Sequence, residues 1–246
     1  MTALLMIDFE TTGLDTGSVT LLEGAWTVCE LDGTQRSALQ QRFMAVGSGH
    51  ELPTVPQARG WTRNGVGADP EALRMAIESG LTAEWLAAPE DSRVRTGPEL
   101  SRLILDHVAQ ACAPKETVHV AGAGVAGYDL PILAGRCPAV RRRVHYRAVD
   151  VSVACTTLWG VNRAEDVRDA YLNAGGDGSV ALAGSPYCMM HRTAEQVAEW
   201  VTDGAERHRA AADVARAIVT QRGLWTMVGD PLRMMLAAER EHKAGD

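Results

Sequence analysis

Two acidic residues, Asp8 and Glu10, follow a short apolar run near the start of the chain. The run, residues 4–7, is long enough for a buried strand and too short for a helix. Because side chains in a strand alternate with a period of two, both carboxylates would project from one face. Like charges held so close repel each other, and burying either without a partner is costly. A bound divalent cation would remove both costs, although a solvated strand end explains these two residues equally well.

The segment that follows, Thr11, Thr12, Gly13 and Leu14, predicts a turn beside these acids. Threonine hydroxyls and backbone N–H groups are hydrogen-bonding groups, and glycine gives the backbone the freedom to turn. The turn would therefore place polar groups at the mouth of a site formed by the two acids.

A third acid, Asp129, opens a predicted helix just after a strand and a loop. Capping of the helix N–H groups accounts for most aspartates at such positions. The same position suits a ligand, because sites in α/β sheets gather at the carboxyl ends of strands. Both interpretations of Asp129 stay open on sequence alone.

His208 and Asp213 lie five residues apart near the end of the chain. Within one helix that gap is about 500° of rotation, so the two side chains would not share a face. We therefore expect His208 at a loop–helix junction and Asp213 inside an apolar-periodic helix, where Asp is a poor helix former. A histidine near a helix start is usually a surface residue. Beside an activated water, however, its unperturbed pKa suits a general base.

Taken together, these residues form a known pattern. Three segments of the chain resemble the three motifs of the DEDDh 3′→5′ exonucleases. They are Asp8-x-Glu10 with Thr-Thr-Gly, Asp129 in Gly-Tyr-Asp-Leu-Pro, and His208-x-x-x-x-Asp213. Their order and position match over most of the chain, and the combination is far more specific than any single motif.

Within that family, the sequence is most similar to the oligoribonuclease branch. Residues 145–152 resemble the Tyr-Arg-x-x-Asp-Val-Ser segment of that branch, and residues 79–82 resemble its Ser-Gly-Leu-Thr. The resemblance implies an α/β, ribonuclease H-like fold with a mixed sheet of about five strands flanked by helices. It also implies one exonuclease domain over residues 1–246, with a core over 3–222 and a C-terminal helix over 230–243. A homodimer like those of the oligoribonucleases is a further expectation.

The resemblance also implies a function. The protein would hydrolyse phosphodiester bonds at the 3′ end of single-stranded or short oligonucleotides, RNA or DNA, and release nucleoside 5′-monophosphates. Two Mg²⁺ or Mn²⁺ ions would be the cofactors, and the backbone of the Thr11–Leu14 turn would hold the terminal nucleotide, with Leu14 against its base. The implied metal ligands are Asp8, Glu10, Asp129 and Asp213, and His208 is the implied general base.

Elementary chemistry agrees with that assignment. Phosphodiester hydrolysis needs an activated water and a stabilised leaving oxygen, and two cations about 3.5–4 Å apart can serve both. Hard cations prefer carboxylate oxygens, which suits four acids and no thiols.

A competing interpretation comes from Gly122, Gly124 and Gly127, which spell a dinucleotide-binding fingerprint between a predicted strand and helix. Asp150 ends the next strand, near where a ribose-binding acid would lie, so an NAD-binding oxidoreductase is an alternative. This alternative leaves the other acids and His208 unexplained, and Pro131 falls in the first turn of its helix. Asp150 could cap the segment that follows it or support the acidic site, and we favour the cap.

A catalytically silent nucleic-acid-binding module is a third option. It ranks low, because all five exonuclease positions hold the expected residue types.

The elements that must position these residues follow from hydrophobic periodicity and turn signals. Asp32-Gly33 is a hairpin signal between the second and third strands. The predicted strands are 4–7, 19–31, 41–46, 117–121 and 144–149, the helices 70–78, 83–88, 98–112, 129–137, 151–159, 193–201, 210–221 and 231–242, and the main loops 47–68 and 173–186.

Composition limits the alternatives further. The chain has 246 residues, of which 46% are hydrophobic and 22% charged, as is ordinary for a soluble globular protein. The formal net charge of −7 disfavours a broad basic surface for duplex DNA. Five scattered cysteines argue for a reducing compartment and against a zinc site. With no membrane-span or signal-peptide pattern, we expect a cytoplasmic protein.

Overall fold

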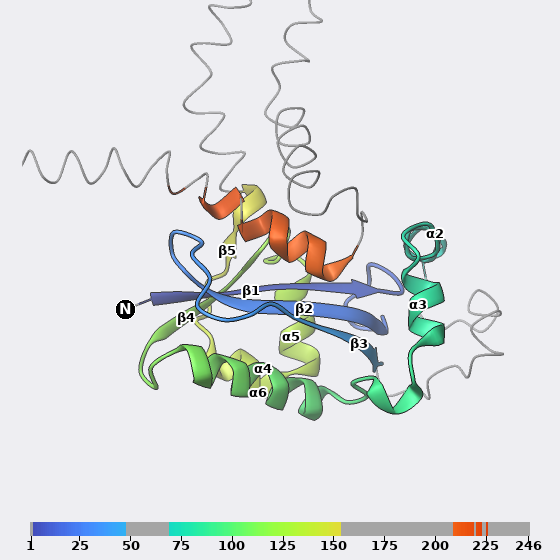
Figure 1. Ribbon diagram of the computed structural model, residues 1–246, viewed down its shortest axis with the longest axis horizontal. Coiled ribbons are helices and arrows are strands. Elements are labelled where there is room, and N and C mark those ends of the chain that lie inside the picture. Colours follow the sequence, from blue (N-terminus) through green and yellow to red (C-terminus); the bar gives the residue numbers. More distant parts are fainter. Residues whose placement is uncertain (1, 48–68, 154–208, 219, 223–224, 226–246) are drawn as a thin grey trace, which may run out of the picture.

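The computed structural model describes residues 2–47, 69–153, 209–218, 220–222 and 225 (Figure 1). Several predictions lie outside the described residues. They concern His208, the helices at 193–201 and 231–242, the loop at 173–186, and most of the loop at 47–68.

A five-stranded mixed sheet lies at the centre of the fold, in the order β3-β2-β1-β4-β5. The central strand β1 pairs antiparallel with β2 and parallel with β4. The predicted α/β architecture with a mixed sheet is thereby confirmed. The strands are β1 (Thr2–Thr11), β2 (Leu21–Glu30), β3 (Gln40–Val46), β4 (Thr117–Gly122) and β5 (Val149–Asp150).

Helices cover both faces of this sheet (Figure 1). On one face, alternate β1 residues such as Leu5 and Ile7 share a buried cluster with Leu100 and Ile132 of the helical layer. The described helices before the C-terminal segment are α2 (Pro70–Glu78), α3 (Leu81–Ala87), the 3₁₀ turn η1 (Glu90–Ser92), α4 (Gly97–Ala111), α5 (Asp129–Arg136) and α6 (Pro138–Arg143). None of the helices in the described ranges is long and apolar enough to cross a membrane.

The opposite face of the sheet is covered by the helix predicted at 210–221, which is described over 210–218 and 220–222. This helix is called the C-terminal helix from here on, and the helix predicted over 230–243 lies outside the described residues. Leu4 and Met6 of β1 pack there against Val214 and Ala217. The alternation of β1 thus buries apolar side chains on both faces, and the residues that continue the Leu4–Met6 face are Asp8 and Glu10.

Two helix starts carry side-chain caps. The Asp69 carboxylate accepts from the backbone N–H of Glu71 at 2.7 Å, and the Thr96 hydroxyl accepts from that of Glu99 at 3.2 Å. Both starts therefore satisfy N–H groups that have no partner within the helix.

One stretch differs from the prediction. Residues 144–149 were expected to form a strand, but β5 is only Val149–Asp150, and α6 precedes it. Pro138 does end α5, as predicted, yet it also begins α6, because proline is well tolerated in the first turn of a helix. A helix of six residues is too short to produce a periodic signal.

Candidate metal site

Three of the predicted ligands meet at one end of the sheet. Asp8, Glu10 and Asp213 each offer a carboxylate oxygen, and these oxygens all lie within 4.8 Å of one another. Asp8 and Glu10 project from β1 as alternate residues on the Leu4–Met6 face of the sheet. Asp213 lies on the C-terminal helix, which packs against the same face. Strand periodicity and helix packing thus bring together side chains separated by some two hundred residues.

Asp129 lies beside this group at the start of α5. It is 2% exposed, and its Oδ1 accepts from the backbone N–H of Phe9 at 3.0 Å. Phe9 stands between the two acids of β1, so this hydrogen bond fixes Asp129 next to them. Its carboxylate is thus engaged with β1, which favours the site interpretation over a simple helix cap.

The acids raise one another's pKa. Burial, with Asp129 and Glu10 nearby, holds the pKa of Asp8 well above its usual range. Burial and the Glu23 carboxylate raise the pKa of Glu10 to about 7. Burial raises that of Asp129 to about 7, although hydrogen bonds from backbone N–H groups oppose the shift. The cluster therefore carries an unfavourable concentration of negative charge once it is ionised.

Two arginines partly offset this charge. Arg216 forms an ion pair with Asp213 one helical turn earlier, and its guanidinium lowers the pKa of Asp8 and of Glu10. Arg209, at the start of the same helix, also lowers the pKa of Glu10. Since two cations beside four carboxylates leave the cluster acidic, it remains suited to divalent cations. Such cations are hard and take carboxylate oxygens as ligands, so the donor set fits Mg²⁺ or Mn²⁺.

These pKa shifts predict how metal binding depends on pH. Glu10 and Asp129 have raised pKa values in the folded chain, so the folded state retains protons that the unfolded chain has released. In the metal-free protein, these two groups therefore lower the free energy of unfolding as the pH rises from their pKa values in the unfolded chain towards about 7. Metal must displace the same protons, so we expect Mn²⁺ affinity to rise with pH between about pH 5 and 7. Calorimetric titrations across this range would measure it, and a pH-independent affinity would contradict it.

The predicted substrate turn is held by internal hydrogen bonds. Thr11 Oγ1 donates to the Gly13 carbonyl at 2.7 Å, and the Tyr128 hydroxyl contacts both Thr11 and Gly13. Thr12 is also engaged, with its N–H donating to the Thr20 carbonyl at 3.0 Å. Leu14, by contrast, is 72% exposed at the tip of the turn, where its side chain is available for contact with a ligand.

Asp150 organises the glycine-rich loop after β4. Its carboxylate accepts from the N–H groups of Gly124 at 3.2 Å and Ala126 at 3.4 Å, and from Ser152 and Val153 at the following helix start. These loop N–H groups are ones that a dinucleotide phosphate would require. The structure therefore gives no support to the NAD-binding alternative, and Asp150 has the capping role that we favoured.

Close packing gives a structural reason for Gly122, the first glycine of that fingerprint. A Cβ there would lie 2.7 Å from the Ile7 carbonyl oxygen of β1. We expect Gly122→Ala to lower the free energy of unfolding by about 1–3 kcal/mol, because the backbone must shift. Gly135→Ala is the control, since a Cβ at this helical position meets nothing within 4 Å. Urea denaturation of both variants would test this, and equal stabilities would contradict it.

Sequence reasoning missed two residues that border the site. Glu23 of β2 lies directly opposite Glu10 in the β1–β2 register and is fully buried. Arg209, 5% exposed, pairs with it from the start of the C-terminal helix. A glutamate inside an otherwise apolar strand was the available signal, whereas the position of Arg209 carried none.

The fold belongs to a recognisable class. A mixed five-stranded sheet with helices on both faces matches the ribonuclease H-like fold of exonuclease structures, as the sequence resemblance implies. No protein-family model matches this sequence, and no curated protein matches it.

Solved structures of exonuclease I are similar to the chain. That of Methylocaldum szegediense has a TM-score of 0.56 at 18% identity, covering 96% of this chain and 43% of that chain. E. coli exonuclease I in complex with a 5cy-dT13 oligonucleotide has a TM-score of 0.54 at 15% identity, covering 99% and 45%. A product-bound exonuclease I has a TM-score of 0.53 at 14% identity, covering 99% and 48%. The chain thus spans less than half the length of these neighbours, and the likeness concerns the fold.

Proposed function

We propose that this protein is a divalent-metal-dependent 3′→5′ exonuclease, with residues 1–246 acting as one exonuclease domain. Its substrates would be single-stranded or short oligonucleotides, and its products nucleoside 5′-monophosphates. The observation that carries the proposal is the meeting of Asp8, Glu10 and Asp213 within 4.8 Å, with Asp129 fixed beside them. That the chain shares its fold with exonuclease I structures supports the same conclusion.

The proposed chemistry assigns roles to the residues of this chain. Asp8, Glu10, Asp129 and Asp213 would hold Mg²⁺ or Mn²⁺. Two such cations, when bound, would activate the attacking water and stabilise the leaving oxygen. His208 would accept the proton of that water as general base, a role for which histidine has a suitable pKa.

The direction of hydrolysis would come from the turn between β1 and β2. Leu14 is exposed at its tip, so its side chain would pack against the terminal base. The Tyr128 hydroxyl and the Thr11 side chain keep this turn folded against the acidic cluster. A turn closed behind the terminal nucleotide would accept a free 3′-hydroxyl end and exclude a continuing strand.

A release assay tests the proposal. Matched RNA and DNA oligonucleotides, from dinucleotides upwards, would carry a label at either the 3′ or the 5′ end. We expect early release of a labelled mononucleotide only from the 3′-labelled strands, with Mg²⁺ or Mn²⁺ present and abolished by EDTA. The DNA arm is included because neighbouring exonuclease I structures contain single-stranded DNA.

The outcomes separate the parts of the proposal. Release of mononucleotides from the 5′ end would contradict the polarity, and hydrolysis in EDTA would contradict the role of metal. Absence of hydrolysis on every RNA and DNA oligomer would overturn the proposed function.

A further inference from the structure

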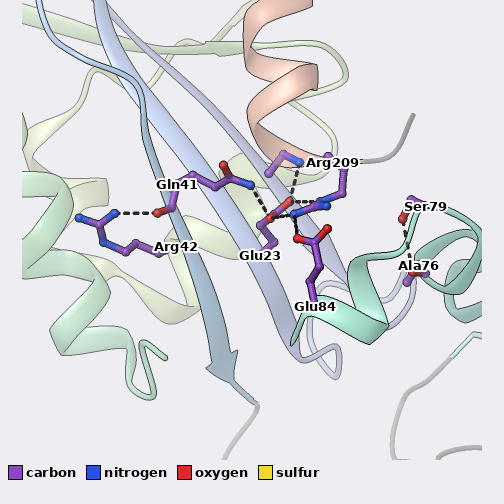
Figure 2. Close-up of polar contacts among 8 residues, drawn as sticks. Glu23, Gln41, Arg42, Ala76, Ser79, Glu84 and Arg209 are labelled. Atoms are coloured by element: carbon purple, nitrogen blue, oxygen red, sulfur yellow. Dashed lines mark hydrogen bonds and ion pairs between the residues drawn. The ribbon is translucent and has the colours of Figure 1, made fainter. Parts of the chain in front are cut away.

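A buried ion pair joins the C-terminal helix to the sheet close to the acidic cluster. Arg209 Nη2 lies 2.9 Å from Glu23 Oε1, and its Nε donates to Glu23 Oε2 at 3.2 Å (Figure 2). The side chain of Arg209 is 5% exposed and that of Glu23 is fully buried. Two parallel hydrogen bonds of this kind fix the orientation of both groups as well as their separation.

The same glutamate and arginine contact further elements. Glu23 also accepts from the backbone N–H of Ala210 at 3.0 Å and from Gln41 of β3 at 2.6 Å. Arg209 Nη2 reaches Glu84 of α3 at 2.9 Å, so the guanidinium bridges two carboxylates (Figure 2). The N-terminus of the C-terminal helix is therefore tied directly to β2 and α3, and to β3 through Glu23.

Stability alone is a weak reason for such a pair. The cost of removing two charges from water often exceeds their attraction, and apolar side chains of similar volume frequently serve a core as well. Glu23 also brings a cost to the site, because it faces Glu10 across the β1–β2 pairing and raises the pKa of that carboxyl. A charged pair in this position is better explained by the geometry that it imposes.

One helical turn connects the Arg209–Glu23 ion pair to the acidic cluster. The Arg209 carbonyl accepts from the backbone N–H of Asp213 at 3.0 Å, so the two residues are the ends of the first turn. Glu23 holds the side chain of Arg209 and the N–H of Ala210 at the same time, which fixes both the axial position and the rotation of the helix start. The carboxylate of Asp213 thereby keeps its place above Asp8 and Glu10.

We propose that Arg209 and Glu23 form a positioning pair that sets Asp213 against the β1 acids for metal binding. The inference rests on the proposed function, because it takes the carboxylate cluster as the metal site. Arg209 touches neither substrate nor metal in this role and acts only through the helix that it anchors.

Arg36, which contacts the far end of β2, offers a matched control. Like Arg209, it bridges two glutamates, with a bidentate contact to Glu30 at 2.6 and 2.7 Å and a contact to Glu116 at 2.9 Å. Glu30 is the last residue of β2, whereas Glu23 lies near its start beside the cluster. Arg36→Gln therefore removes a comparable ion-pair network at the end of β2 away from the acidic residues.

The test compares Arg209→Gln, Arg209→Lys, Glu23→Gln and Arg36→Gln in the full chain. Mn²⁺ affinity is measured by electron paramagnetic resonance titration, and kcat and KM are measured separately on a 3′-labelled oligonucleotide. We expect the first three variants to bind Mn²⁺ about 10–100-fold more weakly, the usual effect of removing a partner that orients a metal ligand. We expect kcat at subsaturating Mn²⁺ to fall with little change in KM, and Arg36→Gln to match the wild type in both.

Arg209→Lys keeps the charge and the aliphatic stem but cannot reproduce the planar fork. It is included because Arg209→Gln could prevent folding, which urea denaturation would reveal. A folded Arg209→Lys with wild-type Mn²⁺ affinity would overturn the positioning role. So would an equal loss in Arg36→Gln, since the effect would then be one of general stability. If the wild type itself bound no Mn²⁺, the proposed function would fail instead.

Discussion

Replacing Asp8 or Asp213 with asparagine should reduce exonuclease activity to background while the chain remains folded. Each substitution keeps the size of the side chain and removes a charged oxygen from a group of three that lie within 4.8 Å. An amide binds a hard cation far more weakly than a carboxylate does, so both ions would be held poorly. Initial rates on a 3′-labelled oligonucleotide over a range of Mg²⁺ concentrations would measure the loss.

Asp8→Asn should be no less stable than the wild type. Asp8 is desolvated and faces two neighbouring acids that raise its pKa, so its neutral replacement removes repulsion from the metal-free protein. Urea denaturation in EDTA should therefore give an equal or higher free energy of unfolding. Asp106→Asn is a suitable control, because this aspartate is exposed on α4 and pairs with Arg102 at 3.2 Å. Wild-type activity in Asp8→Asn, or activity lost equally in Asp106→Asn, would contradict the assignment.

Substitution of the proposed general base should have the second largest effect. We expect His208→Ala to lower kcat by about 10²–10⁴-fold, the usual contribution of a positioned base. Mn²⁺ affinity should stay close to that of the wild type, because the proposed ligands are carboxylates. Single-turnover rates together with Mn²⁺ titrations would separate these two quantities.

Added imidazole provides a check on this second prediction. A small base that diffuses into the space left by the side chain should restore part of the rate in His208→Ala and none in Asp8→Asn. Full activity of His208→Ala without imidazole would show that the histidine has another role.

Much of the site could be predicted because it depends on local periodicity. Alternation along β1 sends Asp8 and Glu10 to the face opposite Leu5 and Ile7, and the structure has this arrangement. The apolar period of the C-terminal helix likewise placed Asp213 inside a helix. Side-chain periodicity is enough to predict where a residue lies when the apolar pattern falls within a single strand or helix.

Long-range partners could not be predicted in the same way. The contact between Glu23 and Arg209 spans 186 positions in the sequence. It depends on the register of β2 against β1, which a single sequence specifies only through the burial of alternate residues. The hydrogen bond from Phe9 to Asp129 is of the same kind, since it needs the parallel pairing of β4 with β1. The prediction of a strand over 144–149 was wrong for a different reason. Most of this segment is irregular, and it follows a helix that is too short to give a periodic signal.

The central claim is that four carboxylates from β1, α5 and the C-terminal helix together bind divalent metal. A Mn²⁺ titration of the wild type and of Asp8→Asn, followed by electron paramagnetic resonance, tests it without reference to any substrate. We expect saturable binding of two ions per chain in the wild type, and its loss in the variant. Wild-type binding in Asp8→Asn, or no saturable binding in either protein, would contradict it.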